Sequence, residues 1–263
     1  MEKEEKLKEI VKEKYGKIVS TSANSCCCSN SCCNSAESIM SESYNDINGY
    51  NPDADYGLGC GLPTKFAKIK KGDTVVDLGS GAGNDCFVAR AEAGETGKII
   101  GIDFTPEMIE KAKQNVKKRG FTNIEFIQGD IDNMPLDSNL ADVIVSNCVL
   151  NLVPNKQVVF KEIYRVLKPQ GHFSISDIVL TKQLPEKIRV MASMYAGCVS
   201  GAVEKDVYLK CIKDAGFKNI TIQKEKNIEI PDEELENQLT KEEIAIYKKD
   251  LDIIKSITVY AEK

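Results

Sequence analysis

The amino-acid sequence predicts an α/β fold, in which a parallel sheet carries helices on both faces and a smaller α+β unit follows at the carboxyl end. Three observations lead to this prediction. From residue 72 onward, short runs rich in β-branched residues alternate with helical stretches, as in parallel strands joined by right-handed crossovers. A glycine-rich turn directly follows the first strand-like run. After about residue 180, the alternation gives way to mixed helical and strand-like segments.

Length and composition allow one full α/β domain and an addition to it. The chain has 263 residues, of which 42% are hydrophobic, so a normal buried core is expected. We divide it into three expected parts. Residues 1–43 form an N-terminal helix and a cysteine-rich loop, residues 44–180 form the main domain, and residues 181–263 form a smaller C-terminal domain.

The N-terminal part combines a charged stretch with a stretch of small polar residues. In residues 1–20, Leu7, Ile10, Val11 and Tyr15 recur at roughly helical spacing, which predicts a solvated helix that docks one narrow stripe. Residues 21–38 are Ser, Asn and Cys for the most part and show no hydrophobic periodicity, which is typical of a loop.

The main domain contains strand-like runs separated by helical ones. The helix at 106–119 has the clearest ends, because Pro106 stands near its start and Gly120 just past its end. The last helix is expected to end at a turn made by residues 168–171. The expected strands are 73–77, 98–104, 124–130, 142–147 and 172–179, and the expected helices are 84–93, 106–119 and 156–167.

The C-terminal part is expected to cover the top of the sheet. It starts with a helical stretch at 186–196 and a glycine-bearing segment, AGCVSGA, at 196–202, which predicts a loop. Residues 208–215 have helical spacing, and 219–230 are strand-like. A charged helix is expected from Lys241 to Lys255, and a last strand at 257–262.

Charge and hydropathy exclude several classes of partner. Lys and Arg number 35 and Asp and Glu number 40, so the net charge is −5, and no basic block favours binding to a phosphate backbone. The N-terminus, MEKEEKLKEI, lacks the apolar stretch of a secretory signal, and no run approaches the roughly 18 apolar residues of a membrane span. We expect a cytoplasmic monomer that binds neither nucleic acid nor membranes.

Ten cysteines stand out in a chain expected to be cytoplasmic. In a reducing compartment, cysteine enrichment indicates metal or redox chemistry rather than a disulfide framework. His172 is the only histidine, so a soft-metal site here must be mostly sulfur. Because free cysteine is commonly a small buried hydrophobe, we expect Cys86 and Cys211 to be core residues, and His172, which opens a strand, to be structural.

The glycine-rich turn carries the first functional signal. The strand ends in Asp77 and runs into Gly79, Gly81 and Gly83, which permit a tight turn and close approach of a ligand. Asp103, about 20 residues past the turn, can accept hydrogen bonds from both ribose hydroxyls, and Asp130 follows the third strand.

The acidic residue before the glycines argues against a pyrophosphate and suits a cationic sulfonium. A turn of this kind also occurs in nicotinamide enzymes and as a purely structural strand-to-helix turn. Residues 70–178 resemble the class I S-adenosylmethionine methyltransferases, whose sheet is Rossmann-like. This resemblance implies that the main domain binds S-adenosylmethionine through Asp77, Gly79, Ser80, Gly81, Gly83, Asp103, Phe104, Met108, Asp130, Ile131 and Asn147.

Three cysteines stand in suggestive positions for a second site. Cys148 lies in SNCVLNLVPNK at the carboxyl end of the fourth strand, where ligands bind in open α/β sheets. Cys60, in YGLGCGLP, and Cys198, in AGCVSGA, each follow a glycine in a segment expected to be a loop. Taken singly, each of these cysteines also suits a buried structural role.

These motifs, together with DLGSGAGNDCF, resemble the arsenite methyltransferase family over most of residues 44–220. The resemblance implies S-adenosylmethionine as methyl donor, trivalent arsenic as acceptor, and a thiol reductant of the glutathione or thioredoxin type, with thioredoxin a candidate partner. It also implies that Cys60, Cys148 and Cys198 are the catalytic arsenic ligands, joined by one or more of the N-terminal cysteines Cys26, Cys27, Cys28, Cys32 and Cys33.

The chemistry is consistent with this reading, because trivalent arsenic is thiophilic and keeps a lone pair when three thiolates bind it. That lone pair can attack a sulfonium methyl without loss of a proton. The expected role is arsenic detoxification. Three alternatives stay open: a methyltransferase for an organic acceptor such as a quinone or sterol-like molecule, a non-enzymatic thiol-rich arsenic- or metal-binding protein, and a zinc site among the N-terminal cysteines. Crowded CCC spacing argues against the zinc site.

Overall fold

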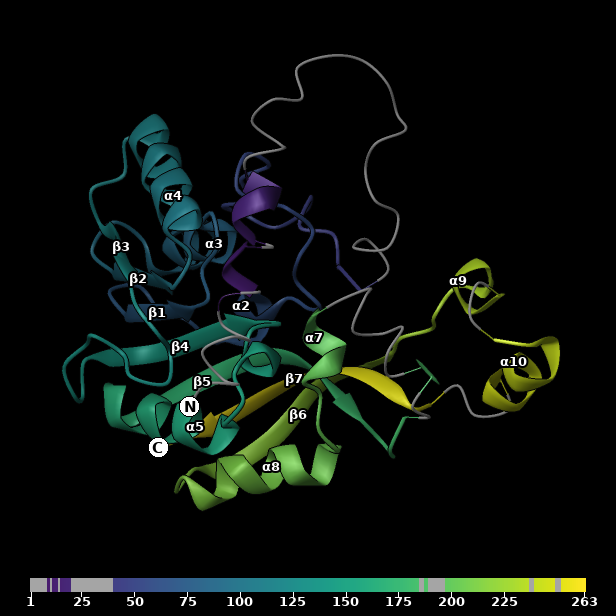
Figure 1. Cartoon of the computed structure of the whole chain (residues 1–263). Helices are drawn as coiled ribbons and strands as arrows, with labels where there is room; N and C mark the ends of the chain where they lie inside the picture. The colour runs from purple at the N-terminus through teal and green to yellow at the C-terminus, as the bar shows by residue number, and fades with distance from the viewer. Residues whose placement is uncertain are drawn as a thin grey trace, which may run out of the picture.

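A single seven-stranded mixed sheet organises the protein, as the computed structural model shows (Figure 1). The structure describes residues 9, 11–13, 15–19, 40–184, 187–188, 197–236, 239–248 and 252–263. The strand order is β3-β2-β1-β4-β5-β7-β6. The strands are β1 Thr74–Leu78, β2 Lys98–Asp103, β3 Ile124–Gln128, β4 Ala141–Asn147, β5 Leu167–Leu180, β6 Lys218–Asn227 and β7 Ile254–Glu262.

The predicted parallel core is confirmed. The five strands of the main domain pair in parallel in the order β3-β2-β1-β4-β5, and β7 and β6 continue the sheet antiparallel to them. The helices of the described residues that have defined bounds are α2 Pro63–Phe66, α3 Asn84–Ala93, α4 Pro106–Arg119, α5 Lys156–Val166, α7 Gly197–Ser200, α8 Lys205–Asp214, α9 Asp232–Glu236 and α10 Lys241–Lys248, with a 3-10 turn, η2, at Leu150–Leu152.

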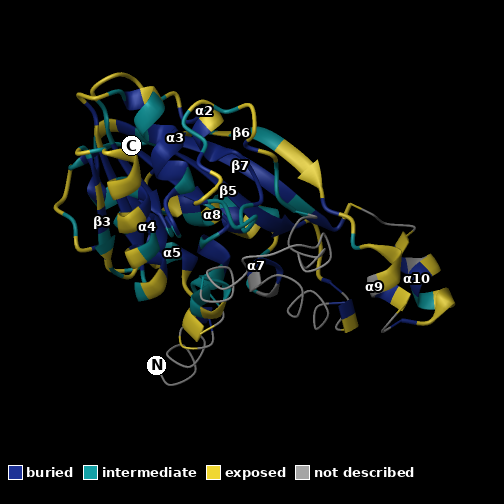
Figure 2. Ribbon diagram, turned by 90° about the horizontal axis from the view of Figure 1, so that it is seen from above, coloured by how far each residue is buried: buried dark blue, intermediate teal, exposed yellow. Residues whose placement is uncertain are grey.

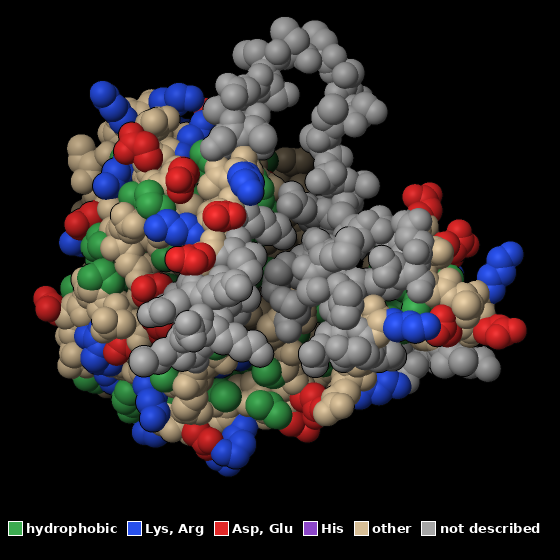
Figure 3. Space-filling view, in the orientation of Figure 1, with side chains coloured by type: hydrophobic (Ala, Val, Ile, Leu, Met, Phe, Trp, Pro, Cys, Tyr) green, Lys and Arg blue, Asp and Glu red, His purple; other side chains and the backbone are tan. Residues whose placement is uncertain are grey.

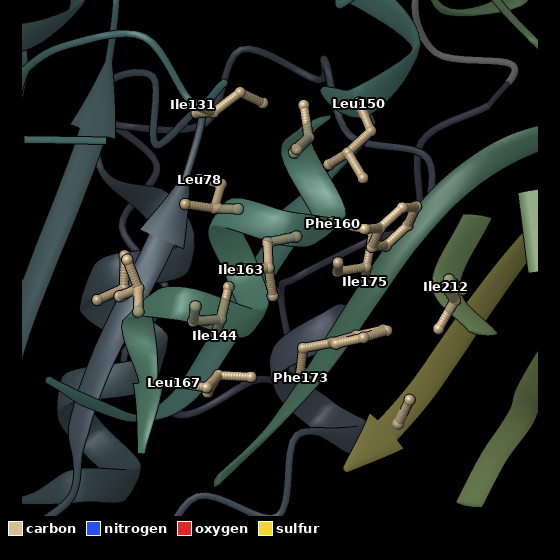
Figure 4. Close-up of a cluster of buried hydrophobic side chains, with 14 of the residues drawn as sticks. Leu78, Ile131, Ile144, Leu150, Phe160, Ile163, Leu167, Phe173, Ile175 and Ile212 are labelled. Atoms are coloured by element: carbon tan, nitrogen blue, oxygen red, sulfur yellow. The ribbon is translucent and has the colours of Figure 1, made fainter. Parts of the chain in front are cut away.

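Helices cover both faces of the sheet because successive strand side chains point in opposite directions. On β1, Val75 belongs to the buried cluster that includes side chains of α3 and α4, whereas its neighbour Val76 belongs to the cluster that includes side chains of α5 and α8. Figure 4 shows part of the second cluster, where Phe160 of α5 meets Phe173 of β5 at a ring separation of 5.9 Å. The central strands are buried on both faces (Figure 2).

Local capping chemistry accounts for the best-predicted helix. The observed α4 has the expected bounds, with Pro106 in its first turn and Gly120 as a C-cap in the left-handed conformation, φ +67°. The N-terminal helix is also present in the described residues, which are helical at 9, 11–13 and 15–19. Val11 is buried there and Tyr15 packs against the α3–α4 side of the core, as expected for the docking stripe; Leu7 and Ile10 lie outside the described residues.

Two expectations about local structure are wrong. Residues 168–171 are not a free turn but part of β5: pairing with β4 passes from Leu167 to His172 through a bulge, in which Gln170 has φ +69°. The helix expected to reach Lys255 does not extend that far: α10 is described over Lys241–Lys248, and residues from Ile254 onward pair with β5 as β7. The helix expected at 186–196 falls mainly outside the described residues.

The C-terminal segment splits into two kinds of structure. Strands β6 and β7 complete the main sheet, whereas α9 and α10 lie beside it at one end (Figures 1 and 2). Acidic and basic side chains are interspersed on the face seen in Figure 3. Within the described part of the chain, no helix combines the length and apolarity that crossing a bilayer requires.

Candidate active site

A cleft lies at the carboxyl ends of the central strands, where open α/β sheets bind ligands. Its empty space is about 770 Å³, including the part open to solvent. Of the predicted cofactor residues, Asp77, Gly79, Ser80, Gly81, Asp103, Phe104, Met108 and Asn147 line this cleft, and Cys148 lines it too. An adjoining hollow shares Gly79, Asp103 and Phe104 with the cleft and is lined by Asp130 and Ile131. The structure therefore gathers nearly all of the predicted cofactor residues in one region.

Gly83 is the exception, because its role is in packing. It is the N-cap of α3 with φ +98°, and a Cβ there would lie 2.7 Å from the Phe126 ring. Gly79 meets a similar limit, since a Cβ would lie 2.3 Å from Val149. Both glycines let the loop fold tightly under the cleft.

The Asp103 carboxylate holds the glycine loop as well as facing the cleft. One oxygen accepts a hydrogen bond from the backbone N–H of Gly81 at 2.9 Å, and the other accepts one from Thr105 at 2.8 Å. Backbone donors of this kind favour the ionised form, whereas burial raises the pKa of Asp103. The sequence predicted a ribose contact for this residue but not its second role within the loop.

The cleft is strongly acidic. Its lining includes Asp55, Asp77, Asp85 and Asp103, and no Lys, Arg or His belongs to it among the described residues. Burial raises the pKa of Asp77 well above its usual value, and repulsion from Asp85 raises it further. Burial also raises the pKa of Asp85 to about 6. A ligand with positive charge would relieve this repulsion, so the donor set fits the sulfonium and ammonium groups of S-adenosylmethionine.

Three predicted cysteines meet at one side of this cleft. Cys60, Cys148 and Cys198 are all buried and share one apolar cluster. Hydrogen bonds with the thiols of Cys198 and Cys60 raise the pKa of Cys148 well above its usual value, and burial raises the pKa of Cys60. The three thiols therefore lie close enough to interact with one another. In the part of the chain described here, no set of three or more His, Cys, Asp and Glu side chains is arranged to hold a metal ion.

Different local interactions hold each of the three cysteines in place. Cys148 follows β4 with φ +62°, a strained conformation for a residue with a side chain, and its N–H donates to the Ser176 carbonyl at 2.8 Å. Cys60 lies in a loop, as expected, and its carbonyl accepts a hydrogen bond from Ser256 Oγ at 2.6 Å. The Cys198 thiol donates to the Cys148 carbonyl at 3.0 Å.

Cys198 was expected in a loop, and this expectation is wrong. It lies on α7, a single helical turn that rests on η2. A Cβ at Gly201 would lie 1.8 Å from the Asn151 carbonyl oxygen, so the two backbones touch. Lys156, which is buried, donates from Nζ to the Gly201 carbonyl at 2.7 Å. This close packing is what brings Cys198 to Cys148.

The remaining cysteines and the histidine play the parts expected of structural residues, or lie outside the described residues. Cys86 is fully buried and its thiol donates to Asp77 at 3.3 Å, and Cys211 is half-buried against the α5–α8 side of the core. His172 Nε2 lies 2.6 Å from the Ala67 carbonyl oxygen. The N-terminal cysteines, residues 26–33, and with them the alternative zinc site, lie outside the described residues.

Tyr44 and Asp85 are among the cleft residues that the sequence did not predict. The Tyr44 hydroxyl donates to both oxygens of the Asp85 carboxylate at 2.9 Å. In sequence, Asp85 looks like an ordinary acidic residue in the first turn of a helix, which favours the helix dipole. Nothing in the sequence indicates that the fold brings Tyr44 to it from 41 residues away.

Comparison with known proteins agrees with this geometry. Residues 69–236 match a family model described as a methyltransferase domain. The arsenite methyltransferase of Halobacterium salinarum is 40% identical over 230 residues, covering 83% of this chain and 59% of that protein. The arsenite methyltransferase of Aquipseudomonas alcaligenes is 31% identical over 242 residues, covering 88% of this chain and 68% of that protein. The chain thus spans only part of the length of these relatives.

Among solved structures, the chain is similar to an arsenic(III) S-adenosylmethionine methyltransferase from Chlamydomonas reinhardtii. The TM-score is 0.66 at 32% sequence identity, and the match covers 78% of this chain and 67% of that one.

Proposed function

The chain belongs to the arsenite methyltransferase family, and on that premise we propose that it transfers a methyl group from S-adenosylmethionine to trivalent arsenic bound by cysteine thiolates. The observation that carries the proposal is the position of Cys148. This residue lines the acidic cleft and also belongs to the buried cluster of three thiols. An acceptor held by these thiols would therefore face a donor held in the cleft.

The residues divide the work between the two sites. The carboxylates of Asp77 and Asp103 and the loop from Gly79 to Gly83 would hold the donor, which supplies an electrophilic methyl group when it is bound. The thiols of Cys60, Cys148 and Cys198 would displace three hydroxides of arsenious acid as water, so arsenic gains three sulfur ligands with no net release of protons. We also propose that the chain divides into functional parts at residues 43 and 180. In this division the C-terminal part contributes Cys198 to the arsenic site.

The apolar surroundings of the thiols suit this chemistry. The cluster around them includes Ile178, Leu180 and Val199, which keep water away from arsenic that is bound to sulfur. No proton leaves the nucleophile, because the lone pair of arsenic attacks the methyl carbon directly. The contribution of the protein is then mainly positioning, which can lower a barrier by about 7–11 kcal/mol.

Methyl transfer takes two electrons from arsenic, raising it from the trivalent to the pentavalent state. We propose that a thiol of the glutathione or thioredoxin type returns these electrons and is oxidised to a disulfide. The N-terminal cysteines would assist capture of arsenite or its reduction. We further propose that the protein works as a cytoplasmic monomer in arsenic detoxification.

Arsenic speciation tests the proposal directly. The full chain is incubated with S-adenosylmethionine, a thiol, and either arsenite or a monomethyl arsenical, and the arsenic species are separated and quantified. We expect methylated products with the wild-type protein. Cys148→Ser or Cys198→Ser should abolish methylation of both substrates, because a hard hydroxyl does not replace a soft thiolate.

Cys60→Ser distinguishes the third ligand. A methylated arsenic has two exchangeable positions and needs only two sulfurs, so this variant should lose activity on arsenite and keep activity on the monomethyl arsenical. S-adenosylmethionine binding should persist in all three variants. Substantial turnover of arsenite by Cys198→Ser would contradict the three-thiolate model, and an enzyme for an organic acceptor would tolerate the loss of Cys60 or Cys198.

A further inference from the structure

A network of hydrogen bonds joins the acidic cleft to the loop that carries Cys60. Its centre is the side-chain amide of Asn147, the last residue of β4. The amide oxygen accepts hydrogen bonds from the backbone N–H groups of Cys60 at 3.0 Å and Gly61 at 3.2 Å. The amide nitrogen donates to the Tyr44 hydroxyl at 2.8 Å, to the Gly61 carbonyl at 2.9 Å and to Asp85 at 3.2 Å. Although Asn147 lines the cleft, its polar atoms are engaged with the protein.

Asp85 anchors the other end of this network. Its carboxylate accepts hydrogen bonds from the Tyr44 hydroxyl, from Asn147, and from the Thr64 hydroxyl at 3.2 Å. The same residue lines the cleft next to Asp77, with which it interacts electrostatically. Asp85 therefore faces the expected donor and also holds Asn147, as does its partner Tyr44.

The loop is fitted closely to the amide, so movement of one must move the other. A Cβ at Gly59 would lie 2.5 Å from the Asn147 amide nitrogen, and a Cβ at Gly61 would lie 2.5 Å from Ser176 Oγ. The loop is pressed against Asn147 on one side and against β5 on the other. The position of the Cys60 thiol thus depends on the orientation of the Asn147 amide.

We propose that Asp85 is a positioning residue that, through Tyr44 and Asn147, couples occupancy of the cofactor cleft to the placement of the Cys60 thiol. The inference rests on the proposed function and links the binding of the two substrates through this network. A cation in the cleft favours the ionised carboxylate, which can accept from all of its donors at once. A protonated carboxyl group would lose acceptor capacity and loosen Asn147.

The electrostatics of the described neighbours agree with this coupling. Burial raises the pKa of Asp85 to about 6, and Asp55 adds to the rise, while the donors Asn147, Tyr44 and Thr64 oppose it. Asp77 stands beside it with a raised pKa of its own. Without a cation in the cleft, burial and the neighbouring carboxylates therefore oppose the ionised form of Asp85.

Coupling between two sites is reciprocal, so donor and arsenite should each raise the affinity for the other by one common factor. The effect should reach inorganic arsenite and spare a monomethyl arsenical, because only the former needs Cys60 as a third ligand. This difference separates the coupling from a general tightening of the protein around its cofactor.

Binding measurements on the full chain test the proposal without turnover. The dissociation constants of arsenite and of a monomethyl arsenical are measured by calorimetry, with and without a donor analogue in which an amine replaces the sulfonium. In the wild-type protein, the analogue should tighten arsenite binding by about tenfold, within the range usual for coupled sites. Asp85→Asn and Tyr44→Phe should reduce that factor to below about twofold. Asp53→Asn should preserve it, and so should Tyr50→Phe, which keeps the ring that stacks on Tyr44, because the polar groups of Asp53 and Tyr50 make no hydrogen bond within the network.

The outcomes separate failure of this inference from failure of the proposed function. A wild-type protein that binds no arsenite removes the proposed function. A protein that binds arsenite without coupling, or whose coupling survives in Asp85→Asn and Tyr44→Phe, overturns the positioning role. Circular dichroism checks folding; if Asp85→Asn does not fold, Tyr44→Phe decides alone, because it leaves the carboxylate in place.

Discussion

Replacing Gly201 with alanine should displace the helical turn that carries Cys198. The Cβ of Gly201→Ala would lie 1.8 Å from the Asn151 carbonyl oxygen, whereas real Cβ atoms essentially never come closer than 3.0 Å. The atom that the new Cβ meets is a backbone oxygen, so the clash cannot be relieved by moving a flexible side chain. Relief requires at least 1.2 Å of movement between α7 and η2.

A movement of this size would break the hydrogen bonds that hold Cys198 next to Cys148. The thiol of Cys198 reaches the Cys148 carbonyl at 3.0 Å, and the hydrogen bond from Lys156 to Gly201 spans 2.7 Å. Overpacking of this kind costs about 1–3 kcal/mol, and a lost hydrogen bond to a charged group costs about 1.5–3 kcal/mol. Taken together, these costs mean that Gly201→Ala should destabilise the protein by about 2.5–6 kcal/mol.

The functional loss should be selective. Arsenite affinity, measured by calorimetry, should fall at least about tenfold, since 1.4 kcal/mol corresponds to that factor. Affinity for S-adenosylmethionine should change little, because Gly201 does not line the cleft. Val207→Ala, on the exposed face of α8, provides a control with no expected effect. A folded Gly201→Ala protein with wild-type arsenite affinity would refute the assignment of Cys198 as a ligand held by this contact.

Three further predictions concern the cofactor, the buried charge and the N-terminus. Asp103→Ala should weaken S-adenosylmethionine binding by about 10- to 150-fold, because a charge-assisted hydrogen bond contributes about 1.5–3 kcal/mol; unchanged affinity in calorimetry would contradict the assignment. Burial raises the pKa of Asp177 to about 7, so the folded state binds the proton more tightly than the unfolded state does, and stability falls as pH rises from about 4 to about 7. Asp177→Asn should therefore gain stability relative to wild type over this interval, by up to about 4 kcal/mol in urea unfolding, and parallel pH profiles would argue against it. Serine at all five cysteines of residues 26–33 should slow methylation of arsenite more than that of a monomethyl arsenical, whereas equal losses would indicate a role in folding.

Elements set by local chemistry were predictable, and elements set by distant pairing were less so. The bounds of α4 follow from a proline and a glycine that act within their own turns. In contrast, Gln170 and Gly171 have the local character of a turn, and only their place between β4 and β7 makes them a bulge in a strand. Residues after Lys248 continue a helical charge pattern, yet the hydrogen bonds offered by β5 turn Ile254–Glu262 into a strand.

The same division holds at the candidate site. Asp77 and the glycine loop could be read from the sequence because the turn that they form is local. The gathering of Cys60, Cys148 and Cys198 was implied by resemblance alone, since no spacing rule relates residues so far apart. Asp85 and Asn147 carry hydrogen bonds whose partners lie 21 to 103 residues away, so their part in holding the Cys60 loop required the fold.

The three thiols come from regions of the chain that meet only when the sheet is complete. The Cys60 carbonyl accepts a hydrogen bond from Ser256, which lies 196 residues further along the chain on β7. A nascent or unfolded chain therefore presents ten cysteines to arsenite with no preference for the three that belong together. Trivalent arsenic would bridge whichever thiols lie close in sequence and trap the chain in the wrong arrangement. Refolding in the presence of arsenite should therefore be slower and less complete than refolding in its absence. The three-thiol site forms only if the chain folds before arsenic bridges the wrong cysteines.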